Sequence, residues 1–412
     1  MRRWVYLLML LAPCAVLAQG PAEPAAVLRT SNLLDGRGHV LHNVTLLIEN
    51  GKIARVETKP AGVPAHAVVY DLRSLTVLPG WMDAHVHPTW HFDENGRLAG
   101  PTEPKEVTMA AAASNSLKML EAGFTTVQSV GSPLDKELRD GINRDELPGP
   151  RILTSLEPIF GRGDATGTPV QLRGVVQQHA KDGADVIKIF ASGSIREGGK
   201  PTLSQEQLNA ICGEANAVKL RTIVHAYGPA VRMASLAGCT EIEHGLYASD
   251  EDLRLLAKNG TYFDPQAGLV LQNYLDNKPH YLGIGNYTES AFETMQKVLP
   301  EFQELFRHAM ATPGLKVVFG TDAVAGAHGR NAEEFLYRVK TCGQDPMAAM
   351  ISANSLAAEA MRIQDHLGSI AAGYDADIIG LEGDPVKDIT AVRRVAFVMK
   401  GGHVYVNHAN PR

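Results

Sequence analysis

Short runs of β-branched and other apolar residues alternate with longer segments of helical periodicity between residues 79 and 365. Eight of these runs can form strands, at residues 81–85, 125–129, 151–154, 186–190, 222–225, 241–244, 261–264 and 317–321. Helical patterns lie between them and include residues 107–122, 205–218 and 289–310. Strands that alternate with helices form parallel sheets, and eight of them over this length are typical of a (β/α)8 barrel. The pattern therefore predicts an α/β protein built around a TIM barrel.

Both ends of the chain have a different pattern, in which short strands follow one another with turns between them. Near the N-terminus, Asn50 and Gly51 separate two apolar runs, and Asn-Gly is a strong hairpin signal. Apolar runs bounded by turn residues return near the C-terminus. We therefore predict that the two ends meet in one small β-sandwich. The expected organisation is a signal peptide at 1–18, the first part of the sandwich at 19–78, the barrel at 79–365 and the second part of the sandwich at 366–412.

The first eighteen residues differ from the rest of the chain. Arg2 and Arg3 precede an apolar stretch at residues 4–11, and small residues lead to Ala18. This order is typical of a secretory signal peptide cleaved near Ala18. Its apolar part is too short to span a membrane comfortably. We therefore expect a periplasmic or secreted protein that is not embedded in a membrane after cleavage.

Composition narrows the possible classes of function. The 412 residues are 45% hydrophobic and 20% charged, which excludes general disorder. The 39 basic and 45 acidic residues give a net charge of −6, and the basic residues form no long runs. A nucleic-acid partner is therefore not expected, because such proteins usually carry a basic surface.

Cysteine usage predicts a fold that does not depend on disulfides. After loss of the first eighteen residues three cysteines remain, Cys212, Cys239 and Cys342, and they are widely spaced. A disulfide framework needs a dense and even set. We therefore expect these three side chains to be buried apolar residues.

Residues with metal-binding or proton-transferring side chains stand in or directly after five of the predicted strands. They are His85, His87, Lys188, His225, His244 and Asp322. His85 and His87 are two positions apart in one strand, so their side chains point the same way and can share a metal ion. Each residue alone has a structural explanation, since a histidine can pack in a core and Asp322 can cap a turn. Five strands that bring such groups to one barrel face predict a metal site instead.

Lys188 needs a separate account, because an ammonium group beside two metal cations would be repelled. A neutral lysine can take up carbon dioxide and become a carbamate, which is an anionic oxygen ligand. With Asp322 and a hydroxide, the carbamate leaves the two-metal centre with a small positive charge that stabilises an anionic transition state. We therefore interpret Lys188 as carboxylated. The alternative is a structural lysine paired with a buried carboxylate.

Several motifs resemble those of the amidohydrolase superfamily. The sequence Pro-Gly-Trp-Met-Asp-Ala-His-Val-His at residues 79–87 is similar to its first-strand signature, and further similar stretches are 121–127, 320–323 and 368–377. The stretches 224–228, 242–245 and 328–331 resemble its prolidase-like, imidazolonepropionase-related branch. That branch includes binuclear zinc carboxypeptidases and ochratoxin-cleaving amidohydrolases. The resemblance covers essentially the whole chain after residue 18, and it also implies a homo-oligomer.

The resemblance implies a role for each candidate ligand. One divalent metal ion would be held by His85, His87 and Asp322, the other by His225 and His244, and the carbamate of Lys188 would bridge the two ions. Zn²⁺ is the expected metal, although Mn²⁺ or Co²⁺ suits the same ligands. A bridging water acidified by the metals would attack the scissile carbonyl carbon. Asp322 would accept the proton of that water and deliver it to the leaving amine.

Three further residues are expected near the substrate. By the resemblance, Tyr227 would hydrogen-bond the carbonyl oxygen or the substrate carboxylate, and His328 would bind substrate or act as a structural turn residue. Arg162 stands where this branch often has a histidine, and a guanidinium there could hold a carboxylate, with a surface arginine as the alternative. Gln128 and Ser129 also depart from the Arg-Asp that is common at their place. These departures leave the substrate specificity open.

The leading hypothesis is a binuclear zinc hydrolase that cuts the amide bond to a C-terminal amino acid. Its substrates would be small molecules or peptides with a free carboxylate: dipeptides, N-acyl amino acids or N-aroyl-phenylalanines of the ochratoxin A type. The alternatives are hydrolysis of a cyclic amide or a lactone at the same metals, and a metal-binding barrel without turnover. Residues 265–290 are a candidate lid or oligomer contact.

Overall fold

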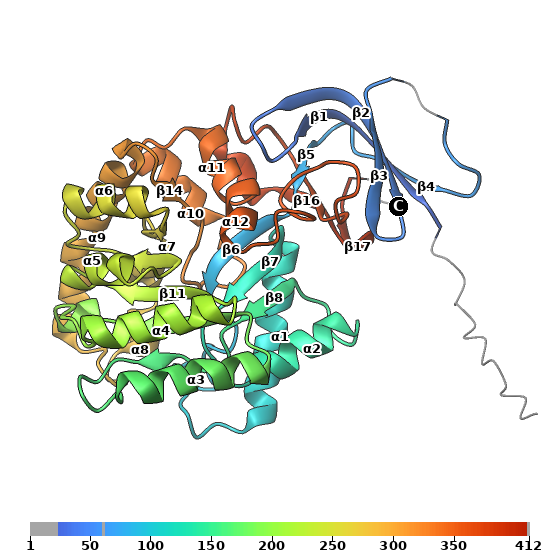
Figure 1. Cartoon of the computed structure of the whole chain (residues 1–412). Coiled ribbons are helices and arrows are strands. Elements are labelled where there is room, and N and C mark those ends of the chain that lie inside the picture. Colours follow the sequence, from blue (N-terminus) through green and yellow to red (C-terminus); the bar gives the residue numbers. More distant parts are fainter. Residues whose placement is uncertain (1–23, 60–61, 410–412) are drawn as a thin grey trace, which may run out of the picture.

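The computed structural model describes residues 24–59 and 62–409. The expected signal peptide at residues 1–18 therefore lies outside the described residues. Figure 1 shows a large body of helices around strands, with a smaller sheet beside it where the blue N-terminal strands and the red C-terminal strands meet. Among the described residues, no helix combines the length and the apolar character that a membrane crossing requires.

The smaller sheet contains strands from both ends of the chain. Its strands are β1 (Ala26–Leu34), β2 (Val40–Glu49), β3 (Lys52–Glu57), β4 (Val68–Asp71), β5 (Thr76–Pro79), β15 (Ile378–Leu381), β16 (Val395–Lys400) and β17 (His403–Asn407). They follow the order β17-β16-β15-β5-β1-β2-β3, with β4 also paired to β1. The antiparallel pair β5–β15, with Pro79 opposite Ile378, joins the two ends. These strands form one mixed sheet, and the domain boundaries remain a prediction.

The Asn50-Gly51 hairpin lies where the sequence places it, between β2 and β3. Both residues have positive φ, 52° for Asn50 and 73° for Gly51. Such a turn matches the twist of two antiparallel strands, and asparagine and glycine adopt it at the lowest steric cost. The hairpin fixes the register of β2 and β3.

The larger body is built on parallel strands. They are β6 (Trp81–Val86), β7 (Phe124–Ser129), β8 (Arg151–Thr154), β9 (Ile159–Phe160), β10 (Val186–Phe190), β11 (Arg221–Ala226), β12 (Glu241–His244), β13 (Tyr262–Asp264) and β14 (Lys316–Val317). They form two sheets, β6-β7-β8 and β9-β10-β11-β12-β13-β14. The sequence predicts one closed eight-stranded barrel, and the structure differs because the third strand is interrupted: β8 pairs with β7, whereas β9 pairs with β10.

The chain segment that follows β14, at the edge of the larger parallel sheet, contacts β6, at the edge of the smaller one. The Ala84 amide donates to the Phe319 carbonyl at 3.0 Å, and the His87 amide donates to the Ala323 carbonyl at 2.9 Å. Val86 and Ala323 form an isolated parallel bridge. The chain after β14 therefore runs beside β6 and brings residue 322 close to the histidines of the first strand.

Helices cover the outside of these strands, as Figure 1 shows. They are α1 (Lys105–Glu121), α2 (Asp135–Asn143), α3 (Pro169–Asp182), α4 (Gln205–Ala217), α5 (Pro229–Leu236), α6 (Asp250–Asn259), α7 (Leu269–Asp276), α8 (Lys278–Tyr281), α9 (Glu289–Ala311), α10 (Glu333–Leu336), α11 (Pro346–Ser352) and α12 (Ser355–Ala360), with single turns η1 (Ile195–Glu197), η2 (Tyr337–Thr341) and η3 (Ile389–Arg393). Thr168, Ser204 and Ser249 begin α3, α4 and α6 with reciprocal capping boxes. These caps satisfy backbone amides that a helix start leaves unpaired.

The cysteine prediction is wrong for two of the three residues. Cys212 of α4 and Cys239, which precedes β12, form a disulfide with their Cα atoms 5.1 Å apart. The third of these residues, Cys342, is a free and buried thiol. The sequence does not reveal this pair, because 27 residues separate the two cysteines and only the packing of α4 beside the turn after α5 brings them together. An odd count is compatible with one bond and one remaining thiol.

Candidate metal centre

The six residues expected to bind metal lie around one cavity at the C-terminal ends of the parallel strands. They come from or directly follow five elements, as His85 and His87 (β6), Lys188 (β10), His225 (β11), His244 (β12) and Asp322 (after β14). All six side chains line a cavity of about 280 Å³. Barrel enzymes carry their chemistry at this end of the strands. The structure thus brings together every ligand candidate that the sequence indicates.

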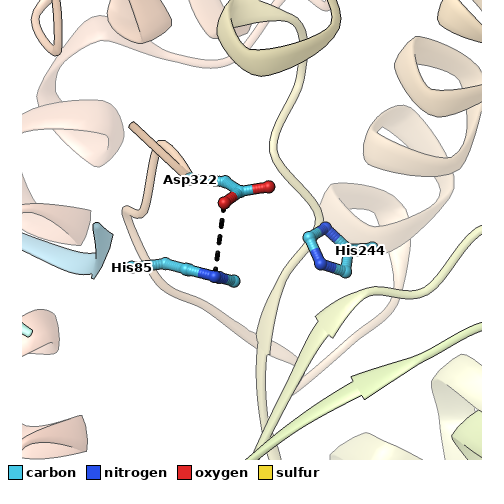
Figure 2. Close-up of side chains that lie close together, drawn as sticks. All are labelled: His85, His244 and Asp322. Atoms are coloured by element: carbon cyan, nitrogen blue, oxygen red, sulfur yellow. Dashed lines mark ion pairs between the residues drawn. The ribbon is translucent and has the colours of Figure 1, made fainter. Parts of the chain in front are cut away.

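Asp322 connects the two histidines of the first strand. Its Oδ1 lies 3.1 Å from His87 Nε2 and 3.5 Å from His85 Nε2. The Nζ of Lys188 lies 3.5 Å from the same nitrogen of His85. Figure 2 shows Asp322, His85 and His244 directed toward one another, and one ligand atom from each lies within 4.8 Å of those of the other two.

The remaining two histidines form a second group beside the first. The rings of His225 and His244 are 4.7 Å apart, and that of His244 is 5.4 Å from His85. His225 Nε2 also lies 3.3 Å from the carbonyl oxygen of Gly193. Four imidazoles, a carboxylate and a lysine therefore face the same small volume.

Two of these residues have an unusual backbone conformation. His244 has φ 65° and Asp322 has φ 51°, in the left-handed region that residues with a side chain rarely adopt. In a regular strand, adjacent side chains point to opposite faces. Here both Glu243 and His244 reach the barrel interior, because the turn at His244 breaks the alternation. Such strain, on the order of 1 kcal/mol or more per residue, persists where the surroundings impose it and is typical of functional sites.

The electrostatics of the site favour metal binding. Burial and the nearby Lys188 lower the pKa of His225 to about 3 and that of His85 well below its usual value. Burial and the neighbouring His225 do the same to the pKa of His244. Burial alone would raise the pKa of Asp322, but His85, His87 and Lys188 outweigh it and hold that pKa at about 2. At neutral pH His85, His225 and His244 therefore offer neutral imidazole lone pairs, and Asp322 offers an ionised carboxylate.

Lys188 differs from an ordinary lysine. Its side chain is fully buried in β10, and burial lowers the pKa of its amine, against the opposing effect of Glu243 and Asp322. Because a lower pKa increases the neutral fraction, the amine is more nucleophilic than a surface lysine. This is the condition that carbamate formation requires.

A group of buried polar side chains holds His85 in place on the side away from Asp322. Glu243 Oε2 lies 2.6 Å from His85 Nδ1, and Gln266 donates to Glu243 at 3.0 Å and to Asp264 at 2.6 Å. Arg338 pairs with Asp264 at 3.1 Å. A proton on His85 Nδ1, donated to Glu243, leaves the lone pair of Nε2 directed at the centre. Metal-binding histidines usually donate their other ring N–H to a carboxylate or carbonyl oxygen in this way. Sequence patterns alone do not indicate this group, because its contacts join residues far apart in the chain.

The donor set fits divalent metal ions. Neutral imidazole nitrogens and carboxylate oxygens are the ligands that Zn²⁺ and similar cations take in proteins. The hydrogen bond between His85 and Glu243 also fixes the orientation of the His85 ring, as metal-binding histidines require. His85, Glu243 and Asp264 also lie within 4.8 Å of one another, but Gln266 and Arg338 already engage the two carboxylates of that group.

The residues expected at the substrate separate into two groups. Tyr227 is buried, lines the cavity and stacks on His244 with ring centroids 5.4 Å apart. His328 is also buried, but it is not among the residues that line the cavity, and its Nε2 lies 3.0 Å from the His87 carbonyl oxygen. Arg162 is exposed, in the loop between β9 and α3, and does not line the cavity either. The structure therefore places Tyr227 at the cavity and leaves His328 and Arg162 outside its lining.

The cavity contains an arginine that the sequence analysis did not single out. Arg196 belongs to η1, in the loop after β10, and lines the cavity with Tyr274. Apolar and aromatic walls come from residues such as Trp90, Phe190 and Phe302. Loops that follow barrel strands are where such enzymes place substrate-binding groups. A search of those loops for charged residues could have found Arg196.

Comparison with known proteins identifies the family. A model of the amidohydrolase family matches residues 76–405. The chain belongs to this family. Ochratoxinase of Aspergillus niger is 26% identical over 438 aligned residues, which cover 95% of this chain and 88% of the ochratoxinase. The imidazolonepropionase of Deinococcus radiodurans is 24% identical, with 93% of each chain covered.

A solved structure extends the likeness to the fold. A Xaa-Pro dipeptidase, with methionine bound in its active site, superimposes with a TM-score of 0.84 at 30% identity, covering 93% of this chain and all of its own. Amidohydrolase relatives of this kind imply a TIM-barrel fold with an additional domain. They also support a hydrolase that acts on amide bonds. Metal ions are general in the family, in line with the ligand groups of this chain.

Proposed function

We propose that this protein is a binuclear metal-dependent amidohydrolase that cuts the amide bond to a C-terminal amino acid. The observation that carries the proposal is the convergence of four imidazoles, Asp322 and the buried Lys188 on one cavity. The two groups of histidines supply enough ligands for two ions. We propose Zn²⁺ as the metal, because tetrahedral nitrogen and oxygen ligation suits it best.

Lys188 is proposed to carry a carbamate. Its Nζ lies 3.5 Å from His85 Nε2, and its strand β10 pairs with β11, the strand that bears His225. A carbamate at this place adds a negative charge and two oxygens to a centre that otherwise holds a single carboxylate among its six candidate ligands. Bound metal ions would supply a water that is acidic near neutral pH and would polarise the scissile carbonyl.

The chain's own residues then have defined tasks. Asp322, which is ionised at neutral pH, accepts a proton from the attacking water and delivers it to the nitrogen of the leaving amine. Burial keeps the Tyr227 hydroxyl protonated, since it raises the pKa of that group. This hydroxyl can therefore donate a hydrogen bond to the oxygen on which negative charge develops. The apolar walls of the cavity hold the side chain of the substrate and exclude water.

The proposed substrates are dipeptides, N-acyl amino acids and N-aroyl amino acids, including ochratoxin A-type N-aroyl-phenylalanines. Aromatic walls from Trp90, Phe160 and Phe190 suit a bulky apolar group. The relatives named ochratoxinase and Xaa-Pro dipeptidase support this class. A cyclic amide or a lactone remains the alternative substrate for the same centre.

The test is a panel of N-acetyl, N-benzoyl and dipeptidyl substrates, each with a free and an amidated carboxylate, assayed with zinc and bicarbonate. We expect hydrolysis of the free acids by the wild type. We expect at least a 100-fold loss (about 3 kcal/mol) in Lys188→Ala, because the bridging ligand is removed. Lys316→Ala is the matched control, since Lys316 pairs with Glu359 on the surface.

Each outcome of this panel distinguishes between the proposed function and its alternatives. Hydrolysis that ignores the carboxylate would favour a general amidase or a lactonase. Absence of hydrolysis would direct the search to cyclic substrates and then to a binding role. Full activity of Lys188→Ala would overturn the proposal that Lys188 carries a carbamate ligand.

We also propose that the protein is exported to the periplasm or secreted, as a homo-oligomer with no nucleic-acid partner. The N-terminal pattern around Arg2 and Arg3 supports export. The Cys212–Cys239 disulfide supports it as well, because such bonds persist in oxidising compartments. N-terminal sequencing of the mature protein from a bacterial host and light scattering would test these two points.

A further inference from the structure

Arg196 is a charged group inside the cavity that the proposed chemistry does not use. It sits in η1 (Ile195–Glu197), and Ser194 caps this turn through its hydroxyl. The cavity that Arg196 lines is the one that holds the histidines and Asp322. If Lys188 is a carbamate, Arg196 is the permanent cation among the residues lining this cavity.

The guanidinium of Arg196 is held in place by aromatic rings and one amide. Its central carbon lies 4.3 Å from the ring centroid of Tyr287 and 5.7 Å from that of Tyr274. Its Nε donates to Asn286 Oδ1 at 3.1 Å, and Asn286 in turn donates to Glu197 at 2.9 Å. Stacking on aromatic faces orients a guanidinium and leaves its edge free to meet a ligand.

No carboxylate in the described part of the chain forms an ion pair with Arg196. Desolvating a charge without a partner is costly, so proteins usually pair such groups. Arg196 is partly buried against an apolar cavity and is still left without an acid. A ligand anion would fill this role.

The position of Arg196 relative to the centre suits a short substrate. Arg196 lines the same cavity as the metal-ligand candidates His225 and Asp322. A carboxylate one carbon away from the scissile nitrogen must lie near the metal ligands without reaching them. Arg196 is among the residues that line this cavity with the metal-ligand candidates, whereas Arg162 is not.

We propose that Arg196 binds the free carboxylate of the substrate and so makes the enzyme selective for amides of amino acids over neutral amides. This inference rests on the proposed function and names its substrate class more narrowly: an anionic N-acyl amino acid whose apolar groups contact the aromatic walls. A planar guanidinium can bind both carboxylate oxygens at once.

The proposal also gives a role to residues 265–290, which the sequence analysis left open between a lid and an oligomer contact. The residues that contact the Arg196 guanidinium all belong to this segment: Tyr274 of α7, Asn286 and Tyr287. Tyr281 of α8 anchors this segment by donating to the carbonyl of Ala325 at 2.7 Å. The segment is therefore a wall that positions the specificity residue.

Binding measurements test the proposal without depending on turnover. The probes are N-benzyl-L-phenylalanine, whose amine cannot be hydrolysed as an amide, and its primary carboxamide, titrated calorimetrically into the zinc-loaded protein. We expect the wild type to bind the acid more tightly than the carboxamide. Arg196→Met should weaken binding of the acid by about 10- to 100-fold and leave the carboxamide within about 2-fold, since a hydrogen-bonded charge is lost.

Two further variants make the result specific. Arg196→Lys keeps the charge but not the two-point contact, so we expect an intermediate loss for the acid. Arg162→Met, which changes an exposed arginine outside the cavity, should bind both probes as the wild type does. Circular dichroism of each variant confirms that the fold is intact.

The outcomes separate this inference from the proposed function. Binding of the acid that depends on Arg196, in a protein that hydrolyses no amide of the panel, would leave the carboxylate site standing and remove the hydrolase. Equal binding of the acid by Arg196→Met and wild type would overturn the carboxylate site, whatever the hydrolysis. A wild type that does not prefer the acid to the carboxamide overturns it as well.

Discussion

Two arginines of this protein, Arg338 and Arg196, lie in buried surroundings and differ in what balances their charge. Arg338 of η2 is fully buried and pairs with Asp264 at 3.1 Å and with Glu334 at 3.2 Å. It also donates to the carbonyl of Val318 at 2.9 Å. Arg196 stacks on Tyr287 at the cavity wall and has no ion pair in the described part of the chain.

This difference in charge balance distinguishes an arginine that stabilises the fold from one that is available to bind a ligand. The charge of Arg338 is balanced by acidic residues of the same chain, so its role is to stabilise the folded structure. The charge of Arg196 is oriented but not balanced, so its partner must come from outside. The same contrast holds between the carboxylate of Asp264, which has two donors, and the imidazoles of the centre, whose lone pairs face a cavity.

The largest expected effect is on folding stability, when Arg338→Met and Arg196→Met are compared side by side. Removing Arg338 leaves Asp264 and Glu334 buried without their cation, which typically costs about 3–5 kcal/mol. Removing Arg196 leaves no buried acid unpaired, so we expect a change below about 1 kcal/mol. Urea unfolding followed by circular dichroism measures both. Equal losses in the two variants would show that Arg196 is a structural residue.

The second prediction concerns the group of buried polar side chains that holds His85 in place. Glu243→Gln keeps the shape of the side chain but weakens the hydrogen bond to His85 Nδ1, now 2.6 Å. We expect a 10- to 100-fold lower affinity for zinc (about 1–3 kcal/mol), because this hydrogen bond orients the imidazole that binds the metal. Competition with a chromogenic chelator measures the affinity. Glu359→Gln, at a surface ion pair with Lys316, should retain the wild-type value.

The smallest effect is expected where water screens the charges. His308 lies 2.6 Å from Asp250 and 3.2 Å from Glu304 on the surface, and the hydrogen bond to Asp250 raises its pKa above 6.5. The folded state therefore favours the protonated form. The stabilisation is complete below the unfolded-state pKa and is lost as the pH rises through the higher folded-state pKa.

For such an exposed pair we expect less than about 1 kcal/mol. The measurement is the free energy of unfolding of wild type and His308→Gln at about pH 5.5 and about pH 8.5. The difference between the two proteins should shrink at the higher pH and at high salt. A difference that grows with pH would contradict the assignment.

Much of the centre could be predicted because strand alternation is a local property. His85 and His87 have the spacing that places two side chains on one face, and the structure puts both at the cavity. Lys188 and His225 likewise lie in strands that the apolar pattern indicates. What could not be predicted is the turn at His244, where positive φ directs the imidazole inward beside Glu243.

The disulfide and the specificity residue were missed for a common reason. Cys212 and Cys239 meet through packing of a helix against a turn, and Arg196 is oriented by Tyr274 and Tyr287, about eighty or ninety residues further along the chain. Loops have no periodicity, so their side chains cannot be placed from the sequence pattern. Arg162, which the sequence favoured as the carboxylate ligand, lies in such a loop as well.

The sequence by itself determined the alternation of strands and helices, the short strands at both ends of the chain and the set of metal-ligand candidates. These features follow from side-chain periodicity and from the chemistry of single residues. Only the tertiary structure decided that the third strand divides into β8 and β9, that one disulfide forms, and that Arg196 rather than Arg162 shares the cavity with Asp322. These features depend on contacts between segments far apart in the chain. Such contacts are set by packing and by the balance of buried charges, which no local pattern records.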